Sequence, residues 1–334
     1  MFTHPPTHDD VLAAIDIGTN NCRLLVARLV PTLQADGSMV LKPEIVDAFS
    51  RLVRLGEGIS QNTELHEAAI IRTLEALSVC ISKMHRRRVT RYRAVATEAC
   101  RRALNSGDFL SRAKQLTGLD IEVIDAAEEA RLALQGCAPL FETPYDYGIH
   151  FDIGGGSTEI VWAKLKPEVS LEAQISIPCG VTALTETYGR DYMSPDTYQT
   201  MLSEIKSNIR PFADKIADVF ATVPGKVQFL GCAGTISTIA ALVQDLPFYQ
   251  RLKVDGHHLK MSDARQIFSR LLALDFEGRA AIPSLGEDRA DLILAGCAIV
   301  EAIADIWQAQ EIRVADRGVR EGILYDLAGV YRLA

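Results

Sequence analysis

Three short loops of glycine and small polar residues are the features of this sequence best suited to chemistry. They are Gly18-Thr19-Asn20-Asn21, Gly154-Gly155-Gly156-Ser157 and Gly231-Cys232-Ala233-Gly234-Thr235, and each follows an apolar run that predicts a strand. Residues this small let backbone N–H groups approach phosphate oxygens closely, and such turns form anion-binding nests. One loop of this kind is more often a simple structural turn. Three such loops in one sequence favour phosphate binding over a purely structural role.

The third loop also precedes a predicted helix, Ile236 to Val243, whose N-terminus adds the positive end of the helix dipole. The predicted phosphate-binding residues of the three loops are Gly18, Thr19, Asn20, Asn21, Gly155, Gly156, Ser157, Thr158, Gly234 and Thr235.

Carboxylates stand beside these loops. Asp16 and Asp152 end the strands before the first and second loops, Glu159 follows the second, and Glu129 lies in the first turn of a predicted helix. Such hard oxygen ligands next to phosphate loops suit Mg²⁺. Each carboxylate could instead cap a helix or form a surface ion pair, and for Glu128 such a structural role is the preferred interpretation. For Asp152 and Glu159, which flank the triple glycine, we favour a functional role.

A basic segment runs from Lys83 to Arg102, with eight Lys or Arg and one acid, Glu98, which gives it a charge of +7. The whole chain carries −8, so the remainder carries −15. A polyanion-binding track and a solvated helix end are equally compatible with its central arginines, Arg86, Arg87, Arg88, Arg91 and Arg93. Arg101 differs, because it directly follows a predicted strand, where its planar guanidinium could clamp a phosphate.

The elements that must position these residues alternate between strand and helix. The run Ile15 to Asn21 aligns with Phe151 to Ser157 at a constant offset of 136 residues, so each half begins with a strand, an aspartate, a glycine turn and a second strand. This duplication predicts an α/β protein of two lobes with a cleft between them. We expect the lobes to span residues 1–126 and 127–317, with a C-terminal helix at about 318–334 that packs back on the first lobe.

Composition excludes several classes of protein. The 334 residues are 48% apolar and 23% charged, which is typical of a globular chain of about two domains. The longest uncharged apolar run, Leu292 to Val300, is too short to span a bilayer. The first ten residues predict a short frayed tail, because they lack the basic-then-apolar order of a signal peptide. The seven cysteines form no C-x-x-C pair and predict buried, reduced thiols in a cytoplasmic protein. The pair His257-His258 has no partner at metal-ligand spacing.

The sequence resembles the exopolyphosphatase and guanosine pentaphosphate phosphohydrolase (Ppx/GppA) family, within the actin-like ATPase superfamily. The stretches that carry the resemblance run almost the whole length of the chain, and jointly they are highly specific. They are Ala14 to Asn20, Val95 to Asn105, Glu128 to Leu132, Phe151 to Glu159, Gly231 to Thr235 and Ala315 to Gly322.

The resemblance implies two ribonuclease-H-like lobes and Mg²⁺-dependent hydrolysis of the terminal phosphoanhydride of inorganic polyphosphate, with release of orthophosphate. Mn²⁺ is an alternative cation. By the resemblance, Glu129 is the catalytic glutamate and Arg101 a phosphate-contacting arginine, with Glu159 also in the catalytic set. Asp152 and Glu159 match the acidic residues around the metal and water, and with Asp16 and Glu129 they are the expected metal ligands. The chain looks like the short, two-domain form of a homodimeric family. It departs from the usual pattern at Asn21, where serine is common, and at Glu98.

Three alternatives stay open. The same chemistry could act on the 5′-phosphate of guanosine pentaphosphate, which also presents a terminal phosphate. An actin-like sugar or acetate kinase would share the duplicated loops, although the run Glu128 to Leu132 and the residue Glu159 weigh against it. A non-catalytic module could bind polyanions through the arginine track. None of these requires nucleic acid or a membrane.

Overall fold

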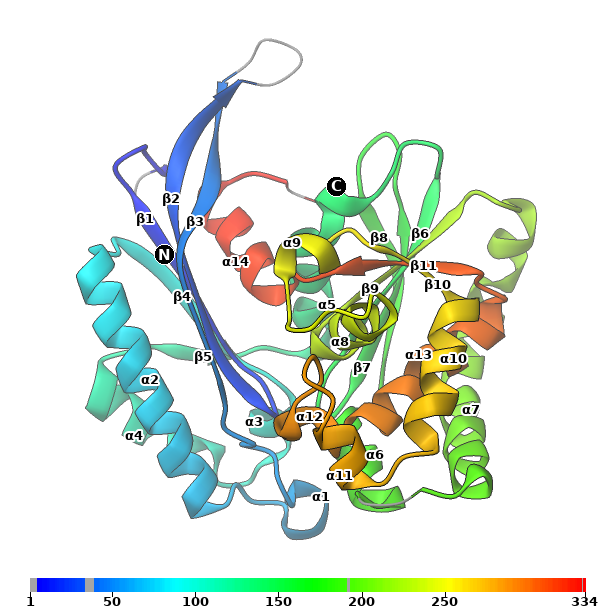
Figure 1. Cartoon of the computed structure of the whole chain (residues 1–334). Coiled ribbons are helices and arrows are strands. Elements are labelled where there is room, and N and C mark those ends of the chain that lie inside the picture. Colours follow the sequence, from blue (N-terminus) through cyan, green and yellow to red (C-terminus); the bar gives the residue numbers. More distant parts are fainter. Residues whose placement is uncertain (1–4, 34–38, 191–192, 332) are drawn as a thin grey trace. The chain divides into compact units, whose positions relative to one another are not determined.

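The computed structural model describes residues 5–33, 39–190, 193–331 and 333–334, so the first four of the ten residues expected to form a frayed tail lie outside the described residues. The chain divides into two units (Figure 1). The first unit comprises residues Met1–Gly136 and Val319–Leu333, and the second comprises Cys137–Gly318 and Ala334. The sequence placed the boundary after residue 126, whereas the units divide after Gly136, near the end of helix α5 (Ala126–Cys137). The C-terminal helix α14 (Val319–Ala328) falls in the first unit.

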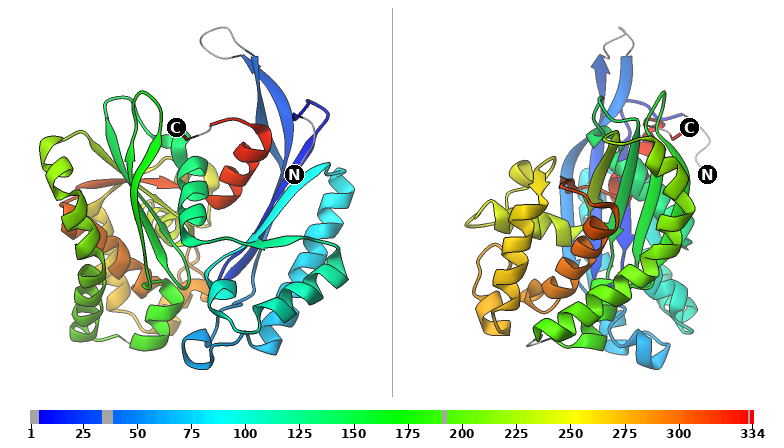
Figure 2. Two further views of the ribbon diagram at one scale, coloured as in Figure 1. Left: turned by 180° about the vertical axis from the view of Figure 1, so that it is seen from behind. Right: turned by 90° about the vertical axis from the view of Figure 1, so that its right-hand side faces the viewer.

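The first unit is built on a mixed sheet with the strand order β3-β2-β1-β4-β5. Strands β1 (Val11–Ile17), β2 (Asn21–Leu33) and β3 (Met39–Leu52) form an antiparallel meander, and β4 (Arg91–Ala96) and β5 (Ile121–Val123) join it in parallel. Helices α2 (Glu67–Arg87) and α4 (Ser106–Thr117) cover one face and α14 the other (Figures 1 and 2). A strand covered on both faces must be apolar throughout, which explains why β1 is an almost unbroken apolar run.

The second unit repeats this plan with the strand order β10-β11-β9-β6-β7-β8. Its antiparallel meander is β6 (Tyr147–Ile153), β7 (Thr158–Lys164) and β8 (Ser170–Ile177). Strands β9 (Val227–Cys232) and β11 (Glu311–Ala315) extend it in parallel, and β10 (His258–Lys260) closes the edge antiparallel to β11. The main core of this unit packs the sheet against helices α6 (Val181–Tyr188), α7 (Pro195–Thr222), α8 (Gly234–Val243), α10 (Met261–Leu272) and α13 (Ile293–Trp307).

The duplication predicted from the sequence is confirmed in detail by the two hairpin turns. In the first unit Ile17 pairs with Cys22, and in the second Ile153 pairs with Thr158, so each hairpin closes over four residues. In both turns the first glycine donates its N–H to the carbonyl of the fourth residue at 2.9 Å, from Gly18 to Asn21 and from Gly154 to Ser157. The glycine loops therefore occupy equivalent positions in two sheets that share the order of five strands, to which the second sheet adds β10.

Short helices fill the remaining connections. They are α1 (Ile59–Asn62), α3 (Glu98–Arg102), the 3₁₀ turn η1 (Ala138–Leu140), α9 (Arg251–Val254), α11 (Phe276–Ala280) and α12 (Glu287–Ala290). The apolar run Leu292 to Val300 belongs to the buried helix α13, and none of the described helices is long and apolar enough to cross a membrane. The seven cysteines all lie in the described part of the chain and are buried with free thiols, as predicted.

Candidate active site

In the first unit, Arg101 and Glu129 form a hydrogen-bonded ion pair. Nη1 of Arg101, on α3, donates to Oε2 of Glu129, in the first turn of α5, at 2.7 Å and to the carbonyl of Ile124 at 2.9 Å. The side chains of Arg101 and Glu129 are only 17% and 11% exposed. Two residues that the sequence assigned to catalysis are thus in direct contact.

The other edge of the Arg101 guanidinium faces Glu98, whose Oε2 accepts from Nε at 3.3 Å and from Nη2 at 2.9 Å. Burial on its own would lower the pKa of Arg101, but Glu129 and Glu98 outweigh it and the pKa is raised. The arginine therefore stays charged. The unexpected acid at position 98 has a clear physical role, because it orients the guanidinium between two carboxylates.

Asp16 lies at the end of β1, next to the first glycine loop, and is only 9% exposed. Burial raises its pKa, opposed by the charges of Arg23 and Arg320 and assisted by Glu321. Arg320 and Glu321 lie in the first turn of α14, and Glu321 is itself buried. No local sequence pattern indicated a role for these two residues, although they fall within the stretch Ala315 to Gly322 that carries the family resemblance.

The first loop is anchored by the segment that follows β3. The carbonyl of Asn20 accepts from the N–H groups of Val53 at 2.8 Å and Arg54 at 2.9 Å, and the carbonyl of Thr19 accepts from Gly56 at 3.0 Å. Thr19 and Asn20 are buried. Arg54 takes a positive φ of 48° to make this turn. The segment 53–56, which no sequence pattern pointed to, therefore fixes the loop.

In the second unit, Glu159 is 2% exposed and its Oε1 accepts from the hydroxyls of Ser157 at 2.7 Å and Ser176 at 2.8 Å. Asp152 is its cross-strand neighbour. The hydroxyl of Ser157 thus donates its hydrogen to Glu159, so Ser157 would bind phosphate through its backbone N–H. The hydroxyl of Thr158, also buried, donates to the carbonyl of Cys179 at 2.7 Å. A hydroxyl has one hydrogen to donate, so both hydroxyls donate within the protein, and phosphate binding by these two residues stays a prediction.

The second loop is fixed by the N-terminus of α6. Val181 donates its N–H to the carbonyl of Gly154 at 3.0 Å, and Thr182 donates to that of Gly155 at 2.8 Å. The third loop leads directly into α8, which begins at Gly234 and includes Thr235. The free N–H groups of that first helical turn are where an anion would bind.

Gly180, just before α6, is a positioning residue that the sequence analysis missed. A Cβ atom there would lie 2.3 Å from the carbonyl oxygen of Gly155 and 2.4 Å from the carbonyl carbon of Gly156, both backbone atoms that cannot rotate away.

We expect Gly180→Ala to displace the loop and lower kcat/KM about 10-fold or more, because small misplacements of a site are costly. Cys179→Ala, which trims the preceding buried side chain, is the control. Steady-state assays and circular dichroism would check this, and equal activity of the two variants would contradict it.

The arginine track predicted from the sequence is largely neutralised within the first unit. Arg87 pairs with Asp47 at 2.9 Å and Arg91 with Asp10 at 3.2 Å. Arg93 pairs with two glutamates, described below. Arg86 and Arg88 are exposed. Arg87, Arg91 and Arg93 therefore already have carboxylate partners, and polyanion binding along this track stays a prediction.

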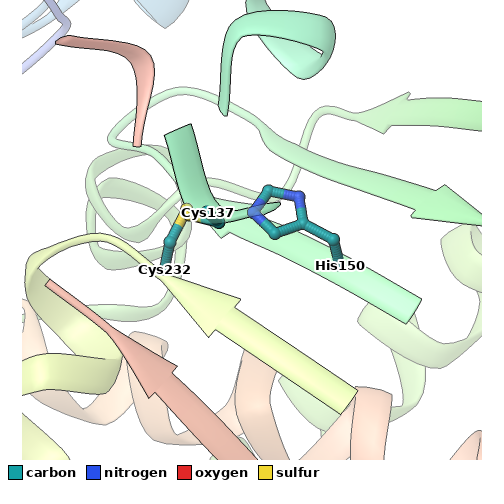
Figure 3. Close-up of side chains that lie close together, drawn as sticks. All are labelled: Cys137, His150 and Cys232. Atoms are coloured by element: carbon teal, nitrogen blue, oxygen red, sulfur yellow. The ribbon is translucent and has the colours of Figure 1, made fainter. Parts of the chain in front are cut away.

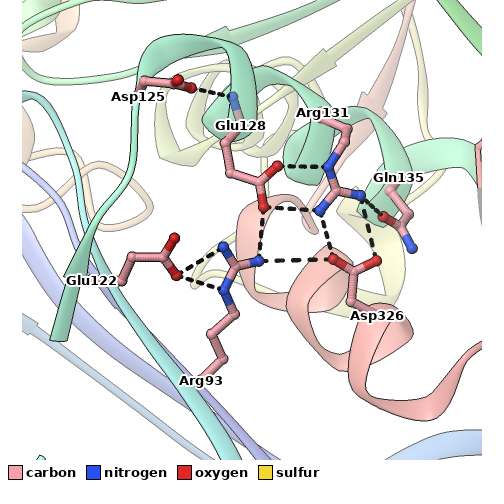
Figure 4. Close-up of polar contacts among 7 residues, drawn as sticks. All are labelled: Arg93, Glu122, Asp125, Glu128, Arg131, Gln135 and Asp326. Carbon is pink, nitrogen blue, oxygen red and sulfur yellow. Dashed lines mark hydrogen bonds and ion pairs between the residues drawn. The ribbon is translucent and has the colours of Figure 1, made fainter. Parts of the chain in front are cut away.

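Arg93 and Arg131 instead form a charge network that holds α5 in place (Figure 4). Arg93, on β4, donates to Glu122 at 2.9 Å and to Glu128 at 2.8 Å. Arg131 donates to Glu128 at 2.7 Å and to Asp326 of α14 at 2.5 Å, and to Gln135. Because Glu128 and Glu129 are adjacent, the network that ties α5 to β4 and α14 also positions Glu129.

We expect Glu128→Gln to lower the free energy of unfolding by about 1–3 kcal/mol, the usual cost of losing partly buried, charged hydrogen bonds. Burial would raise the pKa of Glu128, but hydrogen bonds from Arg131 and Arg93 outweigh it and lower the pKa below the ordinary 4.5. The ionised carboxylate therefore stabilises the fold above pH 4.5, and this contribution is lost as the pH falls through the lowered pKa. Urea denaturation at several pH values would check this. A deficit in the variant that stays constant down to pH 3 would contradict it.

Two repeated α/β sheets, each with carboxylates beside a glycine loop, define a class of protein. This class is the phosphoryl-transfer proteins of the actin-like ATPase fold. The chain belongs to the Ppx/GppA phosphatase family, whose model matches residues 34–330. It is 30% identical to Exopolyphosphatase 2 of Mycobacterium tuberculosis over 95% of this chain and 98% of that one. It is 27% identical to the guanosine-5′-triphosphate,3′-diphosphate pyrophosphatase of Photobacterium profundum over 96% of this chain and 60% of that one. The crystal structure of the Aquifex aeolicus member of the family superposes with a TM-score of 0.75 at 30% identity, covering 95% of this chain and 97% of that one.

Proposed function

We propose that this protein is an exopolyphosphatase that hydrolyses the terminal phosphoanhydride of inorganic polyphosphate and releases orthophosphate. The observation that carries the proposal is the partly buried pair of Arg101 and Glu129 at 2.7 Å, in a chain of the Ppx/GppA family. The relative that matches over nearly its full length is named exopolyphosphatase, and this chain spans 60% of the pyrophosphatase relative.

Phosphoryl transfer requires positioning and charge stabilisation more than covalent chemistry from the protein. Glu129 would orient and deprotonate the attacking water. Glu98 orients the guanidinium of Arg101, which stays charged, and this guanidinium would contact the terminal phosphate. The backbone N–H groups of the glycine loops would bind the remaining phosphate oxygens.

Mg²⁺, or Mn²⁺ in its place, fits the residues present. Each unit offers candidate ligands with only oxygen donors, which these cations prefer: Asp16 and Glu129 in the first unit, and Asp152 and Glu159 in the second. Asp16 supports this further, because burial disfavours its charged form and a nearby cation would offset that cost. When bound, the cation would neutralise charge on the phosphate groups. We propose a cytoplasmic location, where the buried thiols would stay reduced. We also propose that the protein is a homodimer.

The test is orthophosphate release from polyphosphates of defined length and from guanosine pentaphosphate, side by side, with and without Mg²⁺. We expect release from polyphosphate without any acceptor, dependent on the cation. Preferential release from guanosine pentaphosphate would identify the alternative substrate. Transfer only to an added acceptor would identify a kinase, and polyphosphate binding with no release under any condition would overturn the enzymatic proposal.

A further inference from the structure

Three side chains with soft or borderline metal-binding atoms meet inside the second unit (Figure 3). They are Cys137, the last residue of α5; His150, in the middle of β6; and Cys232, the last residue of β9. One ligand atom from each lies within 4.8 Å of the others. The three residues are at most 1% exposed. The function proposed above uses none of them.

Sheet register explains why residues so distant in sequence converge. Strands β6 and β9 are parallel neighbours in which His150 pairs with Leu230 and Asp152 with Cys232. Because residues two apart on a strand face the same side of a sheet, His150 and Cys232 lie diagonally on one face. The end of α5 brings Cys137 to that face (Figure 3). The sequence analysis found no metal motif because the spacing follows from the sheet topology.

The buried imidazole of His150 lacks the hydrogen bonds that a buried polar group normally has. Both of its ring nitrogens are buried and have no hydrogen-bond partner among the described residues. Burial alone lowers its pKa to about 3, so the ring is neutral at physiological pH. Leaving a buried polar group unpaired costs about 1–3 kcal/mol, and such a group requires an explanation. A bound cation would supply the missing partner.

We propose that Cys137, His150 and Cys232 bind a thiophilic divalent cation, Zn²⁺, as a structural site of the second unit. Zinc bonds of about 2.3 Å to sulfur and about 2.0–2.1 Å to nitrogen put tetrahedral ligand atoms about 3.5–3.8 Å apart, so the distances within the cluster have to contract by about 1.3 Å at most. Two thiolates cancel the charge of the ion, which suits a buried site. A disulfide between the cysteines would leave His150 unpaired and therefore explains less.

The location gives the site a structural consequence. The cation would join β6 and β9 just before the second and third glycine loops, and Asp152 interacts with the Cys232 thiol at the same place. Zinc bound here would stabilise the ends of the two strands that carry those loops.

The first test uses Co²⁺, whose thiolate charge-transfer absorption reports cysteine ligation and is not produced by carboxylates. We expect reduced wild-type protein to bind one Co²⁺ per chain with this absorption and Zn²⁺ to displace it. Cys137→Ala should lose the band, with affinity at least about 10-fold weaker, whereas Cys297→Ala, which removes another buried thiol of the same unit, should keep it. Absence of the band from wild type, or its persistence in Cys137→Ala, would overturn the proposal.

The second test needs no variant and covers the case in which Cys137→Ala does not fold. Crystals of the wild-type protein grown with Zn²⁺ under reducing conditions should show an anomalous difference peak between Sγ of Cys137, Sγ of Cys232 and the His150 ring. Zinc found only at the carboxylates, or only at the protein surface, would contradict the site.

Discussion

Glu129→Gln is expected to lower kcat by at least about 100-fold while the protein still folds. General bases contribute about 10²–10⁴-fold, and glutamine keeps the shape and hydrogen-bonding oxygen of the side chain but cannot take a proton. The bond from Arg101 to position 129 can persist, so KM should change much less than kcat. Steady-state phosphate release from polyphosphate and circular dichroism would measure both effects.

The matched control is Glu128→Gln, one residue earlier in the same helical turn. Glu128 bonds to Arg93 and Arg131 rather than to Arg101. We expect that variant to lose stability and retain most of its turnover, the reverse of Glu129→Gln. If the two variants lose turnover equally, the effect comes from displacement of α5, and Glu129 has no special part in catalysis.

Gly322→Ala is expected to cost about 3 kcal/mol of unfolding free energy, at the upper end of overpacking penalties. Gly322 lies in α14 where that helix meets α5, and a Cβ atom there would lie 2.0 Å from the carbonyl oxygen of Leu132 and 2.8 Å from its carbonyl carbon. Because these are backbone atoms of a helix, they move only if the two helices separate. Urea denaturation monitored by circular dichroism would measure the loss.

Gly107→Ala is the matched control for this prediction. Gly107 lies in helix α4 of the same unit, and a Cβ atom there meets nothing within 4 Å. Because alanine favours a helix more than glycine does, we expect this variant to gain about 0.5–1 kcal/mol. If both alanine variants proved equally stable, close packing of α14 on α5 would be excluded.

Local patterns allowed much of the fold to be predicted. Apolar runs followed by turn residues indicated the strands β1, β6 and β9 before the three glycine loops, and the predicted helix from Ile236 to Val243 begins two residues after the observed start of α8 at Gly234. They succeeded because period and turn chemistry act between residues close in sequence. Strand β3 was missed because it is half exposed and contains Pro43 among charged residues, which weakens the apolar alternation.

The sequence by itself determined the duplicated sheets, the glycine loops between their first strands, and the residue types available for phosphate chemistry. Only the tertiary structure decided what each side chain contacts. It pairs Arg101 with Glu129, places Arg93 in a network with Glu128, and commits the Ser157 hydroxyl to Glu159. It also brings His150 to two cysteines. Most of these contacts join residues far apart in the chain, so they depend on strand register and helix packing, which no local pattern encodes.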